Sequence, residues 1–554
     1  MNESSQPQQR LGTSTAVISA LALLICIFGN LGSIGLVGPD EPRYGWIARA
    51  MAATGDWVTP RLYGQPWFEK PILYYWTAAF GFSLHLPAEW ALRLPSALAA
   101  LAAAIAIGWL AWSHYGHGPT LATSPALLAP VLFSTTVAAI GFARAATPDM
   151  LFSACLALSM SSAACALRSR GALRAVNTDS TVPSRDTLAI VLFGAFLGLA
   201  VLAKGPAAIV LAGGAIAIWA LATNRWRIAL RVAHPYSAIA FCVIALPWYV
   251  LCALRNPDFL RIFILQHNFE RYLTPLFQHR QPFWFFGPIV LLSLLPWTVL
   301  LWPAAQEGLL LWRNKSWRDS PGFFFTCWAL FPILFFSFSE SKLPGYILPA
   351  IPPLALLCAV SLVRITGRKK TTTFAALGIA LALTWIGLGL SAGHWTSRLP
   401  PLAHDAVGHS ISIAAATAVA GGVAIAVLAF FRRRAFVALS VLLVVSMVEI
   451  AGWRILPSLD PYISARSHGE LLHNDLHPDR IFTYHLPRSW SYGLAFYLGR
   501  ELPEWSPTDP NSALILTTPK GLKDIQMLHR FYGSLDEQYK GVLYVPVGPT
   551  PQSR

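Results

Sequence analysis

Long uncharged apolar segments recur along the chain from Thr15 to Ala451. Hydrophobic residues make up 55% of the 554 positions and charged residues only 12%, whereas soluble globular domains carry about 25% charged residues. A helix needs about 20 apolar residues to cross the hydrocarbon core of a bilayer, and these segments approach or exceed that length. The sequence therefore predicts an all-α polytopic membrane protein with about thirteen transmembrane helices. The expected spans are residues 15–37, 93–113, 121–143, 148–167, 187–203, 206–223, 236–254, 283–304, 321–338, 343–363, 373–392, 411–431 and 435–451.

Lysine and arginine gather in alternate loops between these spans, and five of the six loops on one side are basic. By the positive-inside rule these loops face the cytoplasm, so the remaining loops face the periplasm of a bacterial inner membrane. This distribution accounts for the net charge of +15. It lacks the continuous basic stripe typical of nucleic-acid binding, so no nucleic-acid partner is expected. The basic loops contain Arg168, Arg170, Arg174 and Arg185; Arg225, Arg227 and Arg231; Arg313, Lys315 and Arg318; Arg364, Arg368, Lys369 and Lys370; and Arg432, Arg433 and Arg434.

Two regions outside the spans have predicted structure of their own. The first outer loop, residues 38–92, contains amphipathic segments at 44–53 and 72–82, which are typical of helices lying along the membrane surface. Beyond Ala451 the composition becomes polar. Strand-like runs occur there at 480–484, 513–518 and 541–547, with helix-like stretches around 491–498 and 521–531. We expect a transmembrane domain over residues 1–451 and a small C-terminal α/β periplasmic domain over residues 452–554.

Two adjacent carboxylates, Asp40 and Glu41, follow the first predicted span in the segment PDEPRY at 39–44, with Arg43 close by. Sugar transfer to a hydroxyl or phosphate acceptor needs a base or an anionic group beside the sugar, and a carboxylate supplies either. Asp40 is the candidate catalytic residue, and Glu41 is a candidate supporting residue. The alternative is a solvated loop in which Asp40 only caps a helix that begins near Pro42.

Lysines at three places, Lys70, Lys204 and Lys342, lie at the outer membrane surface of the predicted arrangement. An ammonium group can bind phosphate as a point charge. The alternative reading is a surface ion pair beside interface anchors for Lys70, snorkelling to the interface for Lys204, and an interface anchor for Lys342. Glu69 precedes Lys70, and Asp149 begins a predicted span. A carboxylate at that depth costs free energy unless it faces a cavity or a partner, so Asp149 is a candidate cavity residue.

The outer loop that begins at Arg255 holds His267 and Arg271, four residues apart and therefore on one helical face. Together they could reach a phosphate or a sugar, although a single histidine in such a loop is more often a surface residue. The chain has no His-Glu-x-x-His zinc motif and no Gly-rich nucleotide-binding loop, so the sequence requires no cofactor. Because several carboxylates share the outer face, the sequence leaves open whether a divalent cation binds there.

Five elements, taken in chain order, resemble the aminoarabinose transferase family. They are PDEPRY at 39–44, FEKP at 68–71, Asp149 at a helix start, Lys204-Gly205, and KLPGY at 342–346. That family is related to the protein O-mannosyltransferases and to other transferases that use polyprenyl-phosphate sugars. The resemblance implies a multi-span protein of the glycosyltransferase C-type fold, with juxtamembrane helices and a periplasmic active site.

The resemblance also implies roles for individual residues. Asp40 corresponds to the catalytic carboxylate, whereas Arg43, Lys70, Lys204 and Lys342 correspond to residues that bind the carrier phosphate. Glu69, Asp149 and Tyr346 correspond to cavity residues. The family pattern His-x-x-Arg-Phe is replaced here by His267, three intervening residues, Arg271 and Tyr272, which weakens that part of the match.

These features predict an enzyme that moves a sugar, aminoarabinose or a related pentose or hexose, from undecaprenyl phosphate to an acceptor. The acceptor is a lipid such as lipid A, another glycan, or a protein. A transporter or flippase for polyprenyl-linked glycans is the alternative, since it would also have many spans and phosphate-binding cations. Alternating access favours polar groups near the midplane of the membrane, whereas here they gather at one surface. That position favours the enzyme.

Overall fold

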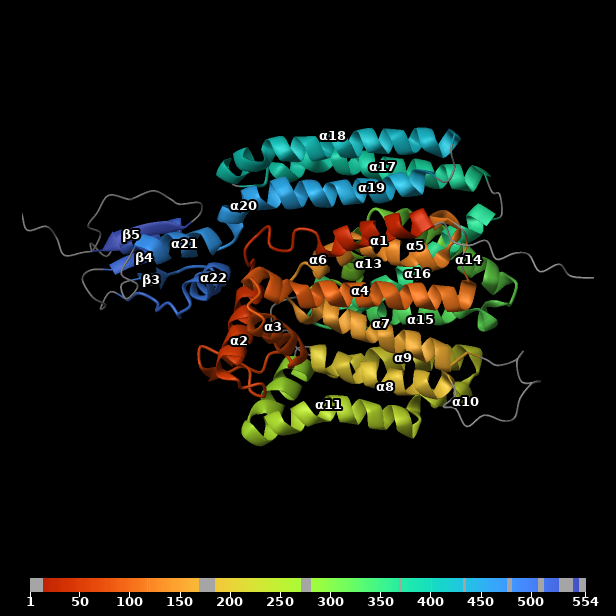
Figure 1. The fold of residues 1–554 in the computed structure, drawn as a ribbon, viewed down its shortest axis with the longest axis horizontal. Coiled ribbons are helices and arrows are strands. Elements are labelled where there is room, and N and C mark those ends of the chain that lie inside the picture. The colour runs from red at the N-terminus through yellow and green to blue at the C-terminus, as the bar shows by residue number, and fades with distance from the viewer. Residues whose placement is uncertain are drawn as a thin grey trace, which may run out of the picture.

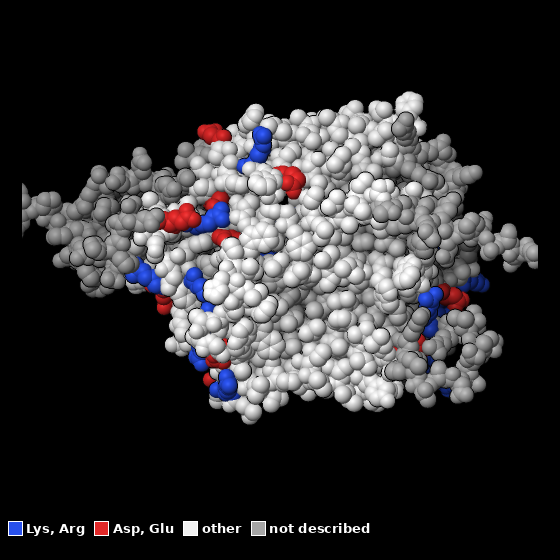
Figure 2. Space-filling view, in the orientation of Figure 1, with Lys and Arg blue, Asp and Glu red and all other residues white. Residues whose placement is uncertain are grey.

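The computed structural model describes residues 13–116, 118, 120–168, 185–270, 280–367, 371–399, 401–431, 435–475, 481–506, 513–527 and 542–547. Their main part is a bundle of apolar helices, and the C-terminal region projects from one end of it (Figure 1). Charged side chains gather near the two ends of the visible face, and a broad band without charges separates them (Figure 2). Such a band suits the hydrocarbon core of a bilayer.

The helices of the bundle follow the predicted apolar segments. They are α1 (Thr13–Phe28), α4 (Ala88–Tyr115), α5 (Pro125–Ser134), α6 (Val137–Ala143), α7 (Pro148–Ala166), α8 (Arg185–Lys204), α9 (Ala207–Thr223), α11 (Pro235–Arg255), α13 (Phe286–Ser293), α14 (Leu301–Arg313), α15 (Pro321–Ser337), α16 (Ile351–Gly367), α17 (Thr371–Thr396), α18 (Pro401–Phe431) and α19 (Ala435–Ile450). Short helical pieces connect them: η1 (Leu121–Thr123), α10 (Trp226–Ala229), η2 (Leu230–Ala233), η3 (Arg261–Glu270), η4 (Phe283–Phe285), η5 (Trp297–Leu300), η6 (Trp317–Asp319) and η7 (Pro344–Ala350).

Within the described ranges, eight helices are long and apolar enough to cross a membrane, or up to ten if each of two bent helix pairs forms one span. The pairs bend by 63° between α5 and α6 and by 108° between the segments 283–293 and 297–313. At the first bend the hydroxyl of Thr136 accepts a hydrogen bond from the backbone N–H of Ala139, which starts a new helix. Three shorter apolar helices add to these, so the predicted multi-span fold is confirmed while the number thirteen stays a prediction.

The first predicted span, residues 15–37, is too long, because α1 ends at Phe28. Asn30 has a left-handed backbone with φ 59°, which a continuing helix does not allow. Arg144 donates hydrogen bonds to the carbonyl oxygens of Ile25, Cys26 and Gly29, which are exposed where the helix ends. Residues 29–38 therefore form a loop that leads directly into the first outer segment.

Two juxtamembrane helices follow this loop: α2 (Asp40–Thr54) and α3 (Leu73–Ser83), with the short hairpin of β1 (Arg61–Leu62) and β2 (Gln65–Pro66) between them. Helix α2 buries one face, which includes Tyr44 and Ile47, and it ends at Gly55, whose φ of 70° suits glycine. Helix α3 is fixed to the bundle, because the Tyr74 hydroxyl donates to the carbonyl oxygen of Leu92 at 2.7 Å. Both amphipathic segments expected in this loop are helices.

The C-terminal region is an α/β unit. After α19 the chain continues through the π-helical turn η8 (Ala451–Ile455) into α20 (Leu456–Ile463), so the helix runs past the boundary expected at residue 452. The rest comprises α21 (Arg466–Asp475), β3 (Ile481–Tyr484), α22 (Arg488–Leu498), β4 (Ala513–Thr517), α23 (Pro519–Met527) and β5 (Leu543–Val547). Strand β4 lies in the middle of the sheet, parallel to β3 and antiparallel to β5. The predicted strands are thus all present.

Candidate active site

Six charged residues gather at the end of the bundle where the juxtamembrane helices lie. Asp40 and Arg43 occupy the first turn of α2, Glu69 and Lys70 precede α3, Asp149 begins α7 and Lys204 ends α8. Helices α7 and α8 are packed against each other, and the start of one meets the end of the other. Because consecutive antiparallel helices bring such ends to the same end of the bundle, Asp149 and Lys204 share one site although they are 55 positions apart.

Arg43 joins the first four of these residues. Its guanidinium lies 2.5 Å from Asp40 and 3.0 Å from Glu69, and Lys70 lies 3.3 Å from Glu69. The side chain of Asp40 is 51% exposed, whereas that of Arg43 is only 11% exposed. Asp40 is therefore the most exposed carboxylate of the cluster, and it is paired with a cation that is itself largely enclosed.

The surroundings of Asp40 raise the proton affinity of its carboxylate. Desolvation raises the pKa of this carboxyl, and Glu69 and Asp149 contribute to the rise, while Arg43 and Lys70 oppose it. Burial alone would lower the pKa of Arg43. The neighbours Glu69, Tyr44 and Asp40 raise this pKa by more than burial lowers it, so the guanidinium stays charged. An anionic Asp40 at the start of α2 also benefits from the helix dipole. The site thus combines a fixed cation with a carboxylate of raised proton affinity.

Lys204 and Asp149 form an ion pair beside this group. The ammonium of Lys204 lies 5.0 Å from the ring centroid of Tyr346 and 5.8 Å from that of Phe152. Gly345 passes close to Asp149: a Cβ at this position would stand 3.0 Å from the carboxylate oxygen and 3.0 Å from the ring of Phe142. The segment before α16 therefore closes one side of the Lys204 site, and the glycine in KLPGY permits that approach.

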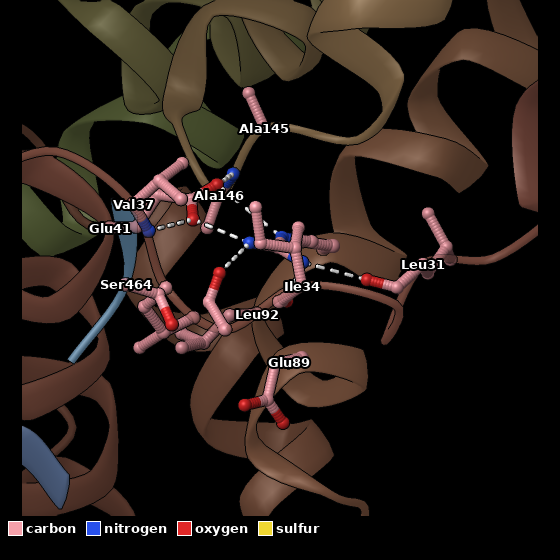
Figure 3. A network of polar contacts seen from close by, with 12 residues as sticks. Leu31, Ile34, Val37, Glu41, Glu89, Leu92, Ala145, Ala146 and Ser464 are labelled. Carbon is pink, nitrogen blue, oxygen red and sulfur yellow. Dashed lines mark hydrogen bonds and ion pairs between the residues drawn. The ribbon is translucent and has the colours of Figure 1, made fainter. Parts of the chain in front are cut away.

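Glu41, expected to support the site, points away from the open cluster into a buried polar network. Figure 3 shows its carboxylate among backbone groups of the neighbouring loops. It accepts hydrogen bonds from the backbone N–H groups of Val37 at 2.9 Å and Ala146 at 2.7 Å, and it pairs with Arg93 at 2.7 Å. Glu41 thus links the start of α2 to the turn before α7.

Arg93 was not among the candidate residues from the sequence. Its guanidinium donates to the carbonyl oxygens of Leu31, Ile34 and Gly35 at 2.7 to 2.8 Å, in addition to Glu41. A charge at the start of an apolar run, which costs free energy in a membrane unless it is paired, was the signal that could have identified it.

The chain's relatives can now be compared with this geometry. Residues 13–263 match the family described as dolichyl-phosphate-mannose-protein mannosyltransferase. The resemblance seen in the motifs is confirmed. Two curated relatives, from Edwardsiella ictaluri and Erwinia tasmaniensis, are 32% and 31% identical over 354 and 347 residues. Both are named undecaprenyl phosphate-alpha-4-amino-4-deoxy-L-arabinose arabinosyl transferase. The matches cover 64% and 62% of this chain and 60% and 59% of the relatives, so the chain spans about three fifths of the relatives' length.

Solved structures share the fold over nearly the whole chain. The crystal structure of ArnT from Cupriavidus metallidurans bound to undecaprenyl phosphate aligns with a TM-score of 0.78 at 23% identity, covering 97% of this chain and 100% of that one. Its apo form aligns with a TM-score of 0.76 at 22% identity, covering 97% and 99%. The glycosyltransferase C-type fold predicted from the motifs is therefore confirmed.

The remaining candidate residues are Lys342, Tyr346, His267 and Arg271. Lys342 is buried, and its ammonium donates to the carbonyl oxygens of Gln281 at 2.9 Å and Ser339 at 2.5 Å, so its described contacts fasten two loops together. Tyr346 faces Lys204, as given above. His267 is part of η3, whereas Arg271 lies outside the described residues. No group of three or more His, Cys, Asp or Glu able to hold a metal ion occurs among the residues that the structure describes.

Proposed function

We propose that this chain is a membrane glycosyltransferase that moves a sugar from undecaprenyl phosphate to an acceptor at the periplasmic face of a bacterial inner membrane. The observation that carries the proposal is the accessible carboxylate of Asp40, 2.5 Å from Arg43 and beside the Lys70 and Lys204 groups at the same membrane surface. The family match and the names of the relatives support the same activity.

The cations suit a departing phosphate. Transfer breaks the bond between the anomeric carbon and the phosphate oxygen of the carrier, and the phosphate leaves with the electron pair. Arg43, Lys70 and Lys204 are each paired with a carboxylate in the described structure, so a bound phosphate would exchange or share those partners. Fixed cations that meet developing negative charge are a large part of many catalytic accelerations.

Asp40 suits the acceptor side. As an oxygen of the acceptor forms its bond to the anomeric carbon, it loses a proton, and a carboxylate within reach accepts it. The half-exposed position of Asp40 leaves room for an acceptor, and its raised pKa makes it a better proton acceptor than an ordinary aspartate. Positive charge that develops on the sugar would also be stabilised by this anion.

We choose the first substrates to test from the names of the relatives. Aminoarabinose is the sugar in their names, so it is the first donor to test, with other pentoses and hexoses next. For the acceptor we place lipid A first, followed by other periplasmic glycans and proteins. Helices α2 and α3 pack on each other beside the cluster, at the end of the bundle where we place the outer membrane surface and the entry of a prenyl carrier and a lipid acceptor.

The decisive experiment incubates purified protein with labelled undecaprenyl phosphate-aminoarabinose and lipid A, and identifies the product by mass spectrometry. We expect Asp40→Asn to lower the transfer rate about 100- to 10,000-fold, the usual contribution of a general base. The matched control is Asp258→Asn, which removes an exposed carboxylate at a surface pair. Equal rates for wild type and Asp40→Asn would remove the assignment of Asp40. Carrier flipping that proceeds in the absence of transfer and ignores Asp40→Asn would instead favour the transporter.

A further inference from the structure

Helix α22 of the C-terminal region packs directly on α2, the helix that carries Asp40 and Arg43. The guanidinium of Arg49 lies 4.1 Å from the ring centroid of Phe496 and donates to the carbonyl oxygen of the same residue at 2.7 Å. A Cβ at Gly45 would stand 2.8 Å from the Phe496 ring, so the glycine allows the two helices to touch. The C-terminal region is therefore in contact with the catalytic helix itself.

Tyr492 lies four residues before Phe496 on α22, and so on the same helical face. Its ring centroid is 5.8 Å from the guanidinium carbon of Arg43. Cation–π attraction extends to about 6 Å, so this distance lies within its range. Tyr63 stacks against Tyr492, with centroids 6.4 Å apart and an angle of 24° between the rings. Tyr492 thus brings a side chain from the far C-terminal region to the phosphate-binding cation of the site.

Aromatic rings also contact the Arg43 guanidinium. The rings of Tyr44 and Trp67 both lie 5.4 Å from its guanidinium carbon. Its Nε atom is buried and has no hydrogen-bond partner within the described part of the chain. Two carboxylates pair with its terminal nitrogen, but those carboxylates would be exchanged or shared when a phosphate binds. The aromatic contacts are then the ones that stay.

We propose that α22 forms part of the active site and that Tyr492 is a positioning residue, which holds the Arg43 guanidinium toward the carrier phosphate. The proposal rests on the proposed function, because it gives Arg43 the carrier phosphate as its ligand. It assigns to the C-terminal region a direct part in donor binding. Tyr492 itself acts through Arg43 and takes no part in the bond changes.

The test compares Tyr492→Leu, which removes the ring, with Tyr492→Phe, which keeps it. Both the KM for the sugar donor and the Kd for undecaprenyl phosphate without a sugar are measured on the full-length protein. A cation–π contact of about 0.5 to 2 kcal/mol corresponds to roughly a 2- to 30-fold change. We expect Tyr492→Leu to raise both constants by that factor with little change in kcat, and Tyr492→Phe to restore them to within about twofold.

Two comparisons separate positioning from general damage to the C-terminal region. Trp490→Leu removes another aromatic of α22, whose ring packs on His468 inside that region at 5.0 Å. An equal rise in the two constants for Trp490→Leu would overturn the proposal. In an Arg43→Gln background, Tyr492→Leu should have no further effect, and a full effect there would overturn it as well.

The same measurements distinguish this inference from the proposed function. If wild-type protein neither binds undecaprenyl phosphate nor transfers a sugar, the proposed function fails. If wild type binds the carrier and Tyr492→Leu binds it equally well, only the role of Tyr492 fails.

Discussion

The guanidinium of Arg93 lies 2.7 Å from the carboxylate of Glu41, and both side chains are almost fully buried, with exposures of 3% and 6%. Arg93 lies in the second turn of α4, and Glu41 belongs to the first turn of the juxtamembrane helix α2. Their pair also binds three carbonyl oxygens and two backbone N–H groups from the loop at 29–38 and the turn at 144–147. This buried pair therefore fixes the backbone that leads to Asp40.

Removal of one partner should destabilise the protein strongly. Glu41→Leu leaves the Arg93 charge buried without its carboxylate, which costs about 3 to 5 kcal/mol in comparable cases. The loss of stability is measured by thermal unfolding of the purified protein in detergent. The control is Arg261→Ala, whose pair with Asp258 has side chains 59% and 70% exposed and should contribute less than about 1 kcal/mol. Similar losses for the two variants would contradict a structural role of the buried pair.

The transfer rate should fall on the acid side of neutrality because Asp40 must be deprotonated to accept a proton. Since desolvation raises the pKa of Asp40, the rate should begin to fall at a pH above the ordinary aspartate pKa of about 3.9. Glu69 raises the Asp40 pKa and Arg43 lowers it. The acid limb of kcat/KM should thus move to lower pH in Glu69→Gln and to higher pH in Arg43→Gln. Movement of both variants in the same direction would exclude Asp40 as the titrating group.

Lys204→Ala should weaken donor binding. A hydrogen bond to a charged group contributes about 1.5 to 3 kcal/mol, which corresponds to roughly a 10- to 150-fold rise in the KM for the donor. Lys204→Arg keeps the charge and should lose less. Lys315→Ala serves as the control, since it removes an exposed lysine between α14 and η6, where the described structure places no candidate site residue. A normal KM in Lys204→Ala would show that the ion pair with Asp149 only stabilises the fold.

Tyr497→Phe should weaken the attachment of the loop before Asp40 to the C-terminal region. The hydroxyl of Tyr497 accepts a hydrogen bond from the backbone N–H of Leu36 and donates one to Glu89, each at 2.8 Å. The phenylalanine leaves a partly buried N–H unsatisfied, at a cost of about 1 to 3 kcal/mol. Hydrogen exchange at Leu36, followed by mass spectrometry, should become faster, while Tyr236→Phe, an exposed tyrosine of α11, should leave it unchanged. Unchanged exchange in Tyr497→Phe would mean that other contacts hold the loop.

The helices of the bundle and the strands of the C-terminal region were predictable because each depends on local pattern. An apolar segment of sufficient length becomes a helix in a bilayer whatever its neighbours are, since its backbone groups must be satisfied within the segment. Short motifs also marked the candidates Asp40, Arg43, Lys70, Asp149 and Lys204, and the structure brings them to one end of the bundle.

What the pattern could not decide is where each side chain points and what meets it. Asp40 and Glu41 are adjacent in the sequence, yet successive residues of a helix diverge by about 100°, so one faces the open cluster and the other is buried against Arg93. The contact between Arg49 and Phe496 joins residues separated by 447 positions. Sequence alone determined which apolar segments form most of the helices of the bundle and which charged residues were candidates for the site. Only the tertiary structure decided that α22 lies on α2, because such a contact depends on the packing of the whole chain and has no local signature.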